Sequence, residues 1–126
     1  MLDDVIAVPE ARHAILLSAD GLLRGHSQGI GVDEAERQAA ALSGLQSISR
    51  STEEFTASGG SPWRQTLVEF DDGFVFLIAA STGAYLAVST SPSVDMEAIT
   101  FRMHKLVDRL GSELTSPPRQ DIGGLR

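Results

Sequence analysis

Residues 33–55, DEAERQAAALSGLQSISRSTEEF, decide the fold, because their pattern predicts one long helix. Asp33 stands where an N-cap residue accepts from the free amides of the first turn, and Glu36 completes the capping-box spacing. Apolar residues recur at helical spacing in two neighbouring stripes. The first stripe consists of Ala35, Ala39, Leu42 and Leu45, and the second of Ala41, Ile48 and Phe55.

The two stripes together cover roughly half of the helix circumference, whereas packing on a sheet needs a stripe of about 100°. Either the helix is buried deeply within its own domain, or the surplus apolar surface packs against a second partner. Ser43, Gly44 and Ser47 favour the close approach of another backbone. Gly44 costs about 1 kcal/mol against alanine in a helix interior, which indicates a packing reason for it.

The composition is that of one small domain. The chain has 126 residues, of which 42% are hydrophobic and 21% charged, enough for a single core. It has no cysteine, which excludes disulfides and thiolate metal sites. The net charge of −7 disfavours nucleic acid and anionic membranes as partners. No apolar run approaches the roughly 20 residues of a membrane span. We therefore expect a cytoplasmic protein without membrane insertion.

The segments before the long helix predict a short helix and a hairpin. Residues 2–8 have helical spacing, and Pro9 ends this helix. Two strands follow at residues 13–18 and 22–27, with Gly21 in the turn between them.

Three more strands are predicted after the long helix, at residues 63–70, 74–80 and 84–89. Their connections are too short for anything but antiparallel neighbours. The strands at 74–80 and 84–89 are apolar at odd and even positions alike, so both of their faces need cover. The strand at 63–70 has mixed polarity, which is typical of a sheet edge.

The last predicted helix carries a core stripe at spacings of three and four residues. This stripe consists of Met96, Ile99, Met103, Leu106 and Leu110. Ser93 is the expected cap and Gly111 the expected C-terminal stop. The polar segment 112–126, with its prolines and glycines, predicts a flexible C-terminal tail. The coarse fold class is α+β: a five-stranded antiparallel sheet between helices.

No motif for catalysis or metal binding is present. His13, His26 and His104 lack metal-ligand spacing, and no phosphate-binding loop or nucleophile motif exists. We therefore expect no catalytic residue, cofactor or metal. An alternative function is a small-ligand sensor with a pocket between sheet and helix. Its expected lining consists of Met96, Phe101 and Met103.

The order and spacing of five segments resemble the Roadblock/dynein light-chain family. The segments are RHAILLSADGL at 12–22, AAALSGL at 39–45, RQTLVE at 64–69, GFVF at 73–76 and AYLAV at 84–88. The chain is most similar to short actinobacterial, conservon-type members, which are encoded with a sensor kinase-like protein and a small GTPase. It is more distantly similar to MglB-like bacterial members. The resemblance covers residues 1–111, which it identifies as a Roadblock domain.

The resemblance implies a profilin-like sandwich with strand order 2-1-5-4-3. One face of the sheet carries the long helix and the other carries the terminal helices. It also implies a homodimer in which the long helices pack and the third strands meet edge to edge. In a twofold dimer the same patch meets itself. The implied contact residues are Ala35, Ala39, Leu42, Ser43, Gln46, Thr66 and Val68.

The family further implies a non-enzymatic regulator or scaffold of a Ras-like small GTPase, which docks on the helix pair. A sensor kinase-like protein is a second implied partner. Such a regulator need not supply a catalytic arginine, because it can reposition the switch loops of the GTPase instead. Arg37 and Arg50 are candidates for contacting the GTPase, although a solvated helix face is the simpler interpretation of both.

Overall fold

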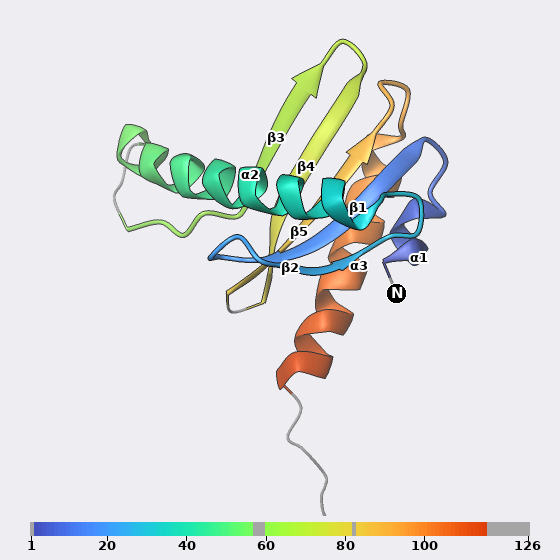
Figure 1. Ribbon diagram of the computed structural model, residues 1–126. Coiled ribbons are helices and arrows are strands. Elements are labelled where there is room, and N and C mark those ends of the chain that lie inside the picture. The colour runs from blue at the N-terminus through green and yellow to red at the C-terminus, as the bar shows by residue number, and fades with distance from the viewer. Residues whose placement is uncertain (1, 57–59, 82, 116–126) are drawn as a thin grey trace, which may run out of the picture.

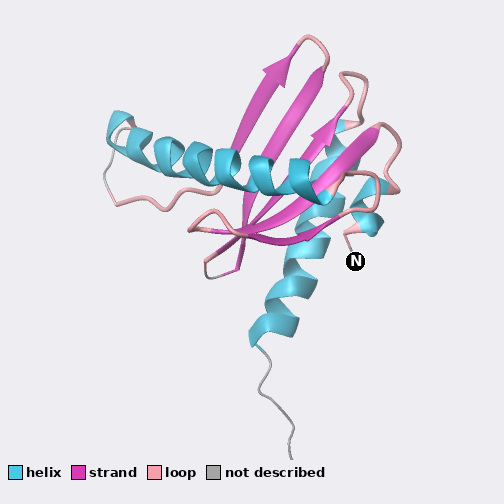
Figure 2. Ribbon diagram, viewed as in Figure 1, coloured by secondary structure: helices cyan, strands magenta, loops and turns pink. Residues whose placement is uncertain are grey.

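A five-stranded antiparallel sheet lies between two layers of helix (Figures 1 and 2). The computed structural model describes residues 2–56, 60–81 and 83–115. The helices are α1 (Asp3–Ile6), α2 (Val32–Ser51), the 3-10 helix η1 (Thr52–Phe55) and α3 (Met96–Thr115). The strands are β1 (Ala11–Ser18), β2 (Leu23–His26), β3 (Gln65–Phe70), β4 (Gly73–Ser81) and β5 (Ala84–Thr90).

The strand order is β2-β1-β5-β4-β3, and all four neighbouring pairs are antiparallel. This confirms the predicted fold class, the predicted order and the edge position of the third strand. Strands β4 and β5 lie inside the sheet because their side chains are apolar on both faces.

The alternation along the strands divides the core into two clusters, one on each face. The face covered by α1 and α3 holds the larger cluster. Its residues on α3 are Ile99, Met103, Leu106 and Leu110, packed against Leu86, Val88, Phe76 and Ile78 of the sheet. The face covered by α2 holds the smaller cluster. Its residues on α2 are Ala35, Ala39 and Leu42, packed against Ile15, Leu17, Leu77, Tyr85 and Ala87.

The predicted long helix is real, but its two ends differ from the prediction. Gly31, in an extended conformation, takes the N-cap position, and no side chain caps the helix. Asp33 therefore lies inside the first turn, where its negative charge interacts favourably with the positive end of the helix dipole, but it does not cap the helix. At the other end the α-helix stops at Ser51, and the predicted remainder to Phe55 is a 3-10 helix.

The predicted ends of the last helix were also wrong. Asp95, not Ser93, is the cap: its Oδ1 accepts from the Ala98 amide at 3.1 Å. Gly111 does not end the helix, which continues to Thr115. Glycine favours a stop but does not impose one when the helix can continue around it. The rest of the predicted tail, residues 116–126, lies outside the described residues.

Gly73 is required where β3 turns into β4. Its φ is +153°, and a Cβ at this position would lie 1.9 Å from the carbonyl oxygen of Thr90. The backbones of β4 and β5 therefore approach too closely here for any side chain.

None of the helices in the described parts of the chain has the length and apolar character needed to cross a membrane.

Candidate protein-interaction surface

The first apolar stripe of α2 faces the sheet of its own subunit. Ala35, Ala39, Leu42 and Gln46 are the buried residues of this helix. Their spacing of four, three and four residues places them on one line along the helix. These four predicted dimer contacts are thus enclosed within one subunit, Leu42 with only 7% of its surface exposed. These four side chains therefore need no second copy to cover them, and their role as dimer contacts stays a prediction.

The second stripe of α2 faces solvent. Ala41 is exposed, Ile48 is 67% exposed, and Phe55 in η1 is 94% exposed. Leu45 lies between them along the same flank and is half-buried. The C-terminal half of α2 crosses the sheet and extends beyond β3 (Figure 1). We call Ala41, Gly44, Leu45 and Ile48 the outer stripe.

Gly44 has no neighbour within its own subunit. A Cβ at this position would meet no atom within 4 Å. Packing inside the subunit therefore does not explain a glycine in the middle of α2, where it lowers helix stability.

The edge strand β3 lies beside this flank of α2. Thr66 pairs with Leu77 and Val68 with Val75, so both residues point toward the α2 face of the sheet. Thr66 Oγ1 donates to Ser49 Oγ at 2.7 Å, which joins the helix to the strand. The outer edge of β3 has no strand partner among the described residues. Open edges of this kind are templates for pairing with another chain.

Trp63 belongs to the core beneath the C-terminal half of α2, although the sequence placed it in the strand. Its ring lies 5.7 Å from the Tyr85 ring in an edge-to-face arrangement. Its Nε1 donates to Thr66 Oγ1 at 2.8 Å. The strand therefore begins at Gln65, since the side chain of Trp63 is directed into the core and not along the sheet edge.

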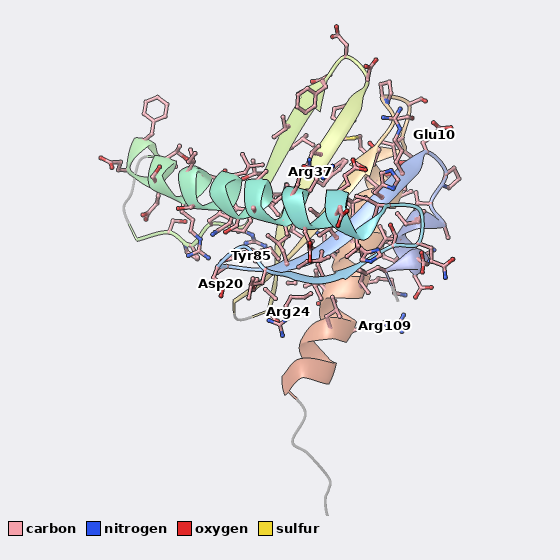
Figure 3. All side chains as sticks on the ribbon, in the orientation of Figure 1. Glu10, Asp20, Arg24, Arg37, Tyr85 and Arg109 are labelled. Atoms are coloured by element: carbon pink, nitrogen blue, oxygen red, sulfur yellow. The ribbon has the colours of Figure 1, made fainter. Side chains whose placement is uncertain are left out.

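The two candidate arginines differ in their surroundings, and Figure 3 labels Arg37 on α2. Arg50 Nη2 donates to the Tyr85 hydroxyl at 2.8 Å, and the guanidinium lies 5.8 Å from the centre of that ring. Arg37 projects from the exposed side of α2. A partner can reach Arg37 without breaking an internal contact, whereas Arg50 helps to hold α2 on the sheet.

The turn between β1 and β2 supports the other flank of α2. Ser43, a predicted dimer contact, donates through Oγ to the Ala19 carbonyl at 2.7 Å. Within the turn, Ser18 Oγ donates to the Asp20 carboxylate. That hydrogen bond holds the pKa of Asp20 below its ordinary value, because it stabilises the charged form.

The predicted methionine pocket is assembled only in part, because Phe101 lies apart from Met96 and Met103. Met103 is 1% exposed within the core, whereas Phe101 is 63% exposed on the outer side of α3. Met96 and Met103 line a cavity of 90 Å³ between α3 and β3, but Phe101 lines a separate groove beside Arg102 and Lys105. The reason is helical geometry: Phe101 and Met103 are two positions apart and point to different sides of α3.

Sequence reasoning missed a second cavity, of 140 Å³, between the N-terminal half of α2 and the sheet. Its lining residues come from β1, α2, β4, β5 and the loop before α2, so no local motif reveals it. The Nδ1 atom of His13, which lines this cavity, is buried without a hydrogen-bond partner in the described structure. Such an unpaired buried group costs about 1–3 kcal/mol.

The described residues contain no cluster of three histidine or acidic side chains arranged to hold a metal ion. The candidate functional features are therefore the outer stripe, the β3 edge and the 140 Å³ cavity.

Comparison with known proteins agrees with this fold. The Roadblock/LC7 domain model matches residues 1–90. A Roadblock/LC7 domain from Streptomyces avermitilis is 34% identical with a TM-score of 0.83, covering 92% of this chain and 95% of that one. Myxococcus xanthus MglB shares the fold, with 15% identity, a TM-score of 0.79 and 90% coverage of both chains.

Profilin IB from Acanthamoeba castellanii also shares the fold, at 16% identity, with a TM-score of 0.61 and coverage of 87% of this chain and 92% of profilin. This likeness confirms the predicted profilin-like architecture. A comparison with curated proteins gives no significant match. The match over residues 1–90 and the 34% identity over most of the chain lead to one conclusion: the chain belongs to the Roadblock/LC7 domain family.

Proposed function

We propose that this protein is a homodimeric, non-enzymatic regulator or scaffold of a Ras-like small GTPase. The observation that carries the proposal is the outer stripe of α2 lying beside the open edge of β3. The GTPase as partner rests on the family resemblance, and a sensor kinase-like protein is a further partner that the same resemblance suggests.

Self-association explains three features of the subunit together. Ala41 and Ile48 of the outer stripe are solvent-exposed, a Cβ at Gly44 would meet no atom within 4 Å, and the outer edge of β3 has no strand partner among the described residues. A twofold axis beside β3 pairs this edge with its own copy and brings the two outer stripes together. A glycine at the seam lets the two helix backbones approach closely.

The proposed interface differs from the set predicted from the sequence. Thr66 and Val68 remain, because they lie on β3 beside the seam. The four residues of the outer stripe replace Ala35, Ala39, Leu42 and Gln46, which are buried within the subunit. Ser43 remains only as a support of α2, through its hydrogen bond to the β1–β2 turn.

The GTPase is proposed to dock on the paired α2 helices, with Arg37 as a contact. No arginine is assigned to catalysis. The regulator acts by holding the switch loops of the GTPase in one arrangement, which requires only shape and charge complementarity. Because the protein is acidic overall, with a net charge of −7, exposed arginines are the natural contacts for the acidic side chains of a partner.

The dimer is tested by light scattering after size exclusion over a range of concentrations. Ile48→Asp places a charge on the outer stripe, and we expect it to give the mass of one subunit. Val32→Asp is the matched control, because Val32 is also exposed on α2 (52%) but lies outside the stripe. A wild-type protein that elutes as a single subunit, or an Ile48→Asp variant that remains dimeric, contradicts the proposed interface.

The GTPase is tested separately with the small GTPase encoded nearest to this chain, loaded with GDP or with a non-hydrolysable GTP analogue. We expect co-elution in at least one nucleotide state and a loss of affinity for Arg37→Glu. Co-elution in neither state removes the partner but leaves the dimer intact.

A further inference from the structure

The 140 Å³ cavity lies where α2 leaves part of the sheet uncovered. Strand register places His13 opposite Ser89 and Ser89 opposite Val75, so these three residues form a row across β1, β5 and β4. The adjacent row, which contains Ile15 and Ala87, lies directly beneath α2. The cavity therefore opens along the flank of α2. It lies above the row of His13, Ser89 and Val75 and beside the row that contains Ile15 and Ala87.

The lining of the cavity divides into an apolar floor and a polar rim. The floor is formed by Ile15, Ile30, Leu42, Val75 and Ala87. The rim is formed by His13, Glu34, Gln38 and Ser89. An apolar body with few converging polar groups is the usual character of a small-ligand site.

The size of the cavity limits the ligand to a single small ring or a short branched chain. A protein cavity of about 150 Å³ lined by aliphatic side chains holds one benzene molecule. The volume of 140 Å³ is close to that value. It is well below the roughly 300 Å³ at which sites for drug-sized molecules begin.

The rim selects the polar head of the ligand. Glu34 is exposed in the first turn of α2 and forms no ion pair among the described residues. Gln38 follows one turn later, and Ser89 faces it from the sheet. All three side chains can accept hydrogen bonds, and Glu34 when ionised can only accept.

His13 adds an unpaired ring nitrogen to the rim. A neutral imidazole has one nitrogen with a free lone pair, and His13 Nδ1 is buried without a partner in the described structure. The ring is packed against the loop before α2, where a Cβ at Gly29 would lie 3.7 Å from it. A ligand with several N–H donors matches this set of acceptors better than an anion does.

From this arrangement we propose that the cavity is a binding site for a small primary amine with a compact apolar body. The body occupies the space between Ile15, Leu42 and Val75, and the ammonium group lies at the rim between Glu34 and Gln38. The bound amine fills the gap between α2 and the sheet and so fastens the helix in place. This site is independent of the proposed GTPase partner, since it requires neither dimer nor nucleotide.

The probe is benzylamine, added to the uniformly ¹⁵N-labelled full chain and followed by amide chemical shifts. We expect a millimolar dissociation constant, with the largest shifts at Ile15, Ile30 and Ala87. Benzoate is the matched ligand control, because it has the same ring and the opposite charge. Benzoate binding as tightly as benzylamine overturns the assignment of the rim, and an absence of shifts at 20 mM benzylamine overturns the site.

Two variants locate the binding. Ala87→Val reduces the volume of the floor, and we expect it to abolish the shifts. Glu34→Gln removes the rim charge at an exposed position, where folding is not at risk. We expect it to weaken benzylamine about two- to fivefold, the range for an exposed ion pair. Glu36→Gln, an exposed change on the same helix away from the cavity, is the control. Equal weakening by both glutamine variants means that general charge attraction, not the rim, holds the amine.

Discussion

Replacing Gly44 by alanine separates the stability of the subunit from the stability of the dimer. Gly44 lies in the interior of α2 on its exposed side, and its own subunit places nothing within 4 Å of a Cβ there. In an isolated subunit the change should therefore stabilise the helix by about 0.5–1 kcal/mol. For a chain of 126 residues this raises Tm by about 2–4 °C.

In the proposed dimer the sign of the effect should be reversed. If two α2 backbones meet at Gly44, the added methyl groups overfill the seam, and overpacking costs about 1–3 kcal/mol. A loss of that size raises the dissociation constant of the dimer at least about fivefold. The Tm gain should accordingly be visible only at concentrations where the dimer is dissociated.

The assay is thermal unfolding at several protein concentrations, together with sedimentation equilibrium. Gly111→Ala is the matched control, because Gly111 also lies within a helix and a Cβ there would meet no atom within 4 Å. That control should stabilise the protein without weakening the dimer. A Gly44→Ala variant that behaves like Gly111→Ala, with an unchanged dissociation constant, refutes the reasoning that places Gly44 at the seam.

Three further changes test the subunit itself. Gly73→Ala should lower the free energy of unfolding by at least about 2 kcal/mol in urea titrations, because the Cβ would collide with the Thr90 carbonyl oxygen at 1.9 Å. Leu42→Ala should cost about 2–5 kcal/mol in the same titrations, because Leu42 is 7% exposed in the core beneath α2. Asp20→Asn should lower Tm at pH 7, because the Ser18 hydrogen bond depresses the pKa of Asp20 in the folded state. A carboxylate whose pKa is lower in the folded state than its unfolded pKa of about 3.9 stabilises the fold at pH values above that unfolded pKa. This stabilisation is lost as the pH falls through the lower pKa of the folded state. The Tm difference between Asp20→Asn and wild type should therefore shrink in melts as the pH falls below the unfolded value.

The sheet was predictable from the sequence because its signals are local. Residues 74–80 were predicted as a strand, and β4 covers Gly73–Ser81. Apolar side chains at odd and even positions alike predicted that the strands at 74–80 and 84–89 are covered on both faces. The order of the strands was not predictable from these signals and came from the family resemblance, since pairing between β1 and β5 joins residues more than 60 positions apart.

The orientation of α2 was not predictable, because both of its stripes have helical spacing. The structure places the stripe of small residues, Ala35 and Ala39, against the sheet, and leaves Ile48 exposed. Small side chains let the helix lie close to the strands, whereas Ile48 in the same place would hold it away. Gln46, which the family resemblance implied as a dimer contact, is buried within the subunit, although a polar residue seldom lies in a core. The cavity was invisible for a related reason: its lining comes from five separate segments.

The two helical layers are attached to the sheet with unequal strength. Helix α3 buries Ile99, Met103, Leu106 and Leu110 in its cluster, whereas α2 buries one large apolar side chain, Leu42, and two alanines. Fully burying a large side chain is worth about 1.5–3 kcal/mol, and alanine contributes much less. Helix α2 is therefore the more weakly held of the two, although both are 20 residues long. A helix of that length with so small an internal contact would gain from the proposed second copy on its outer stripe, where Ile48 is 67% exposed.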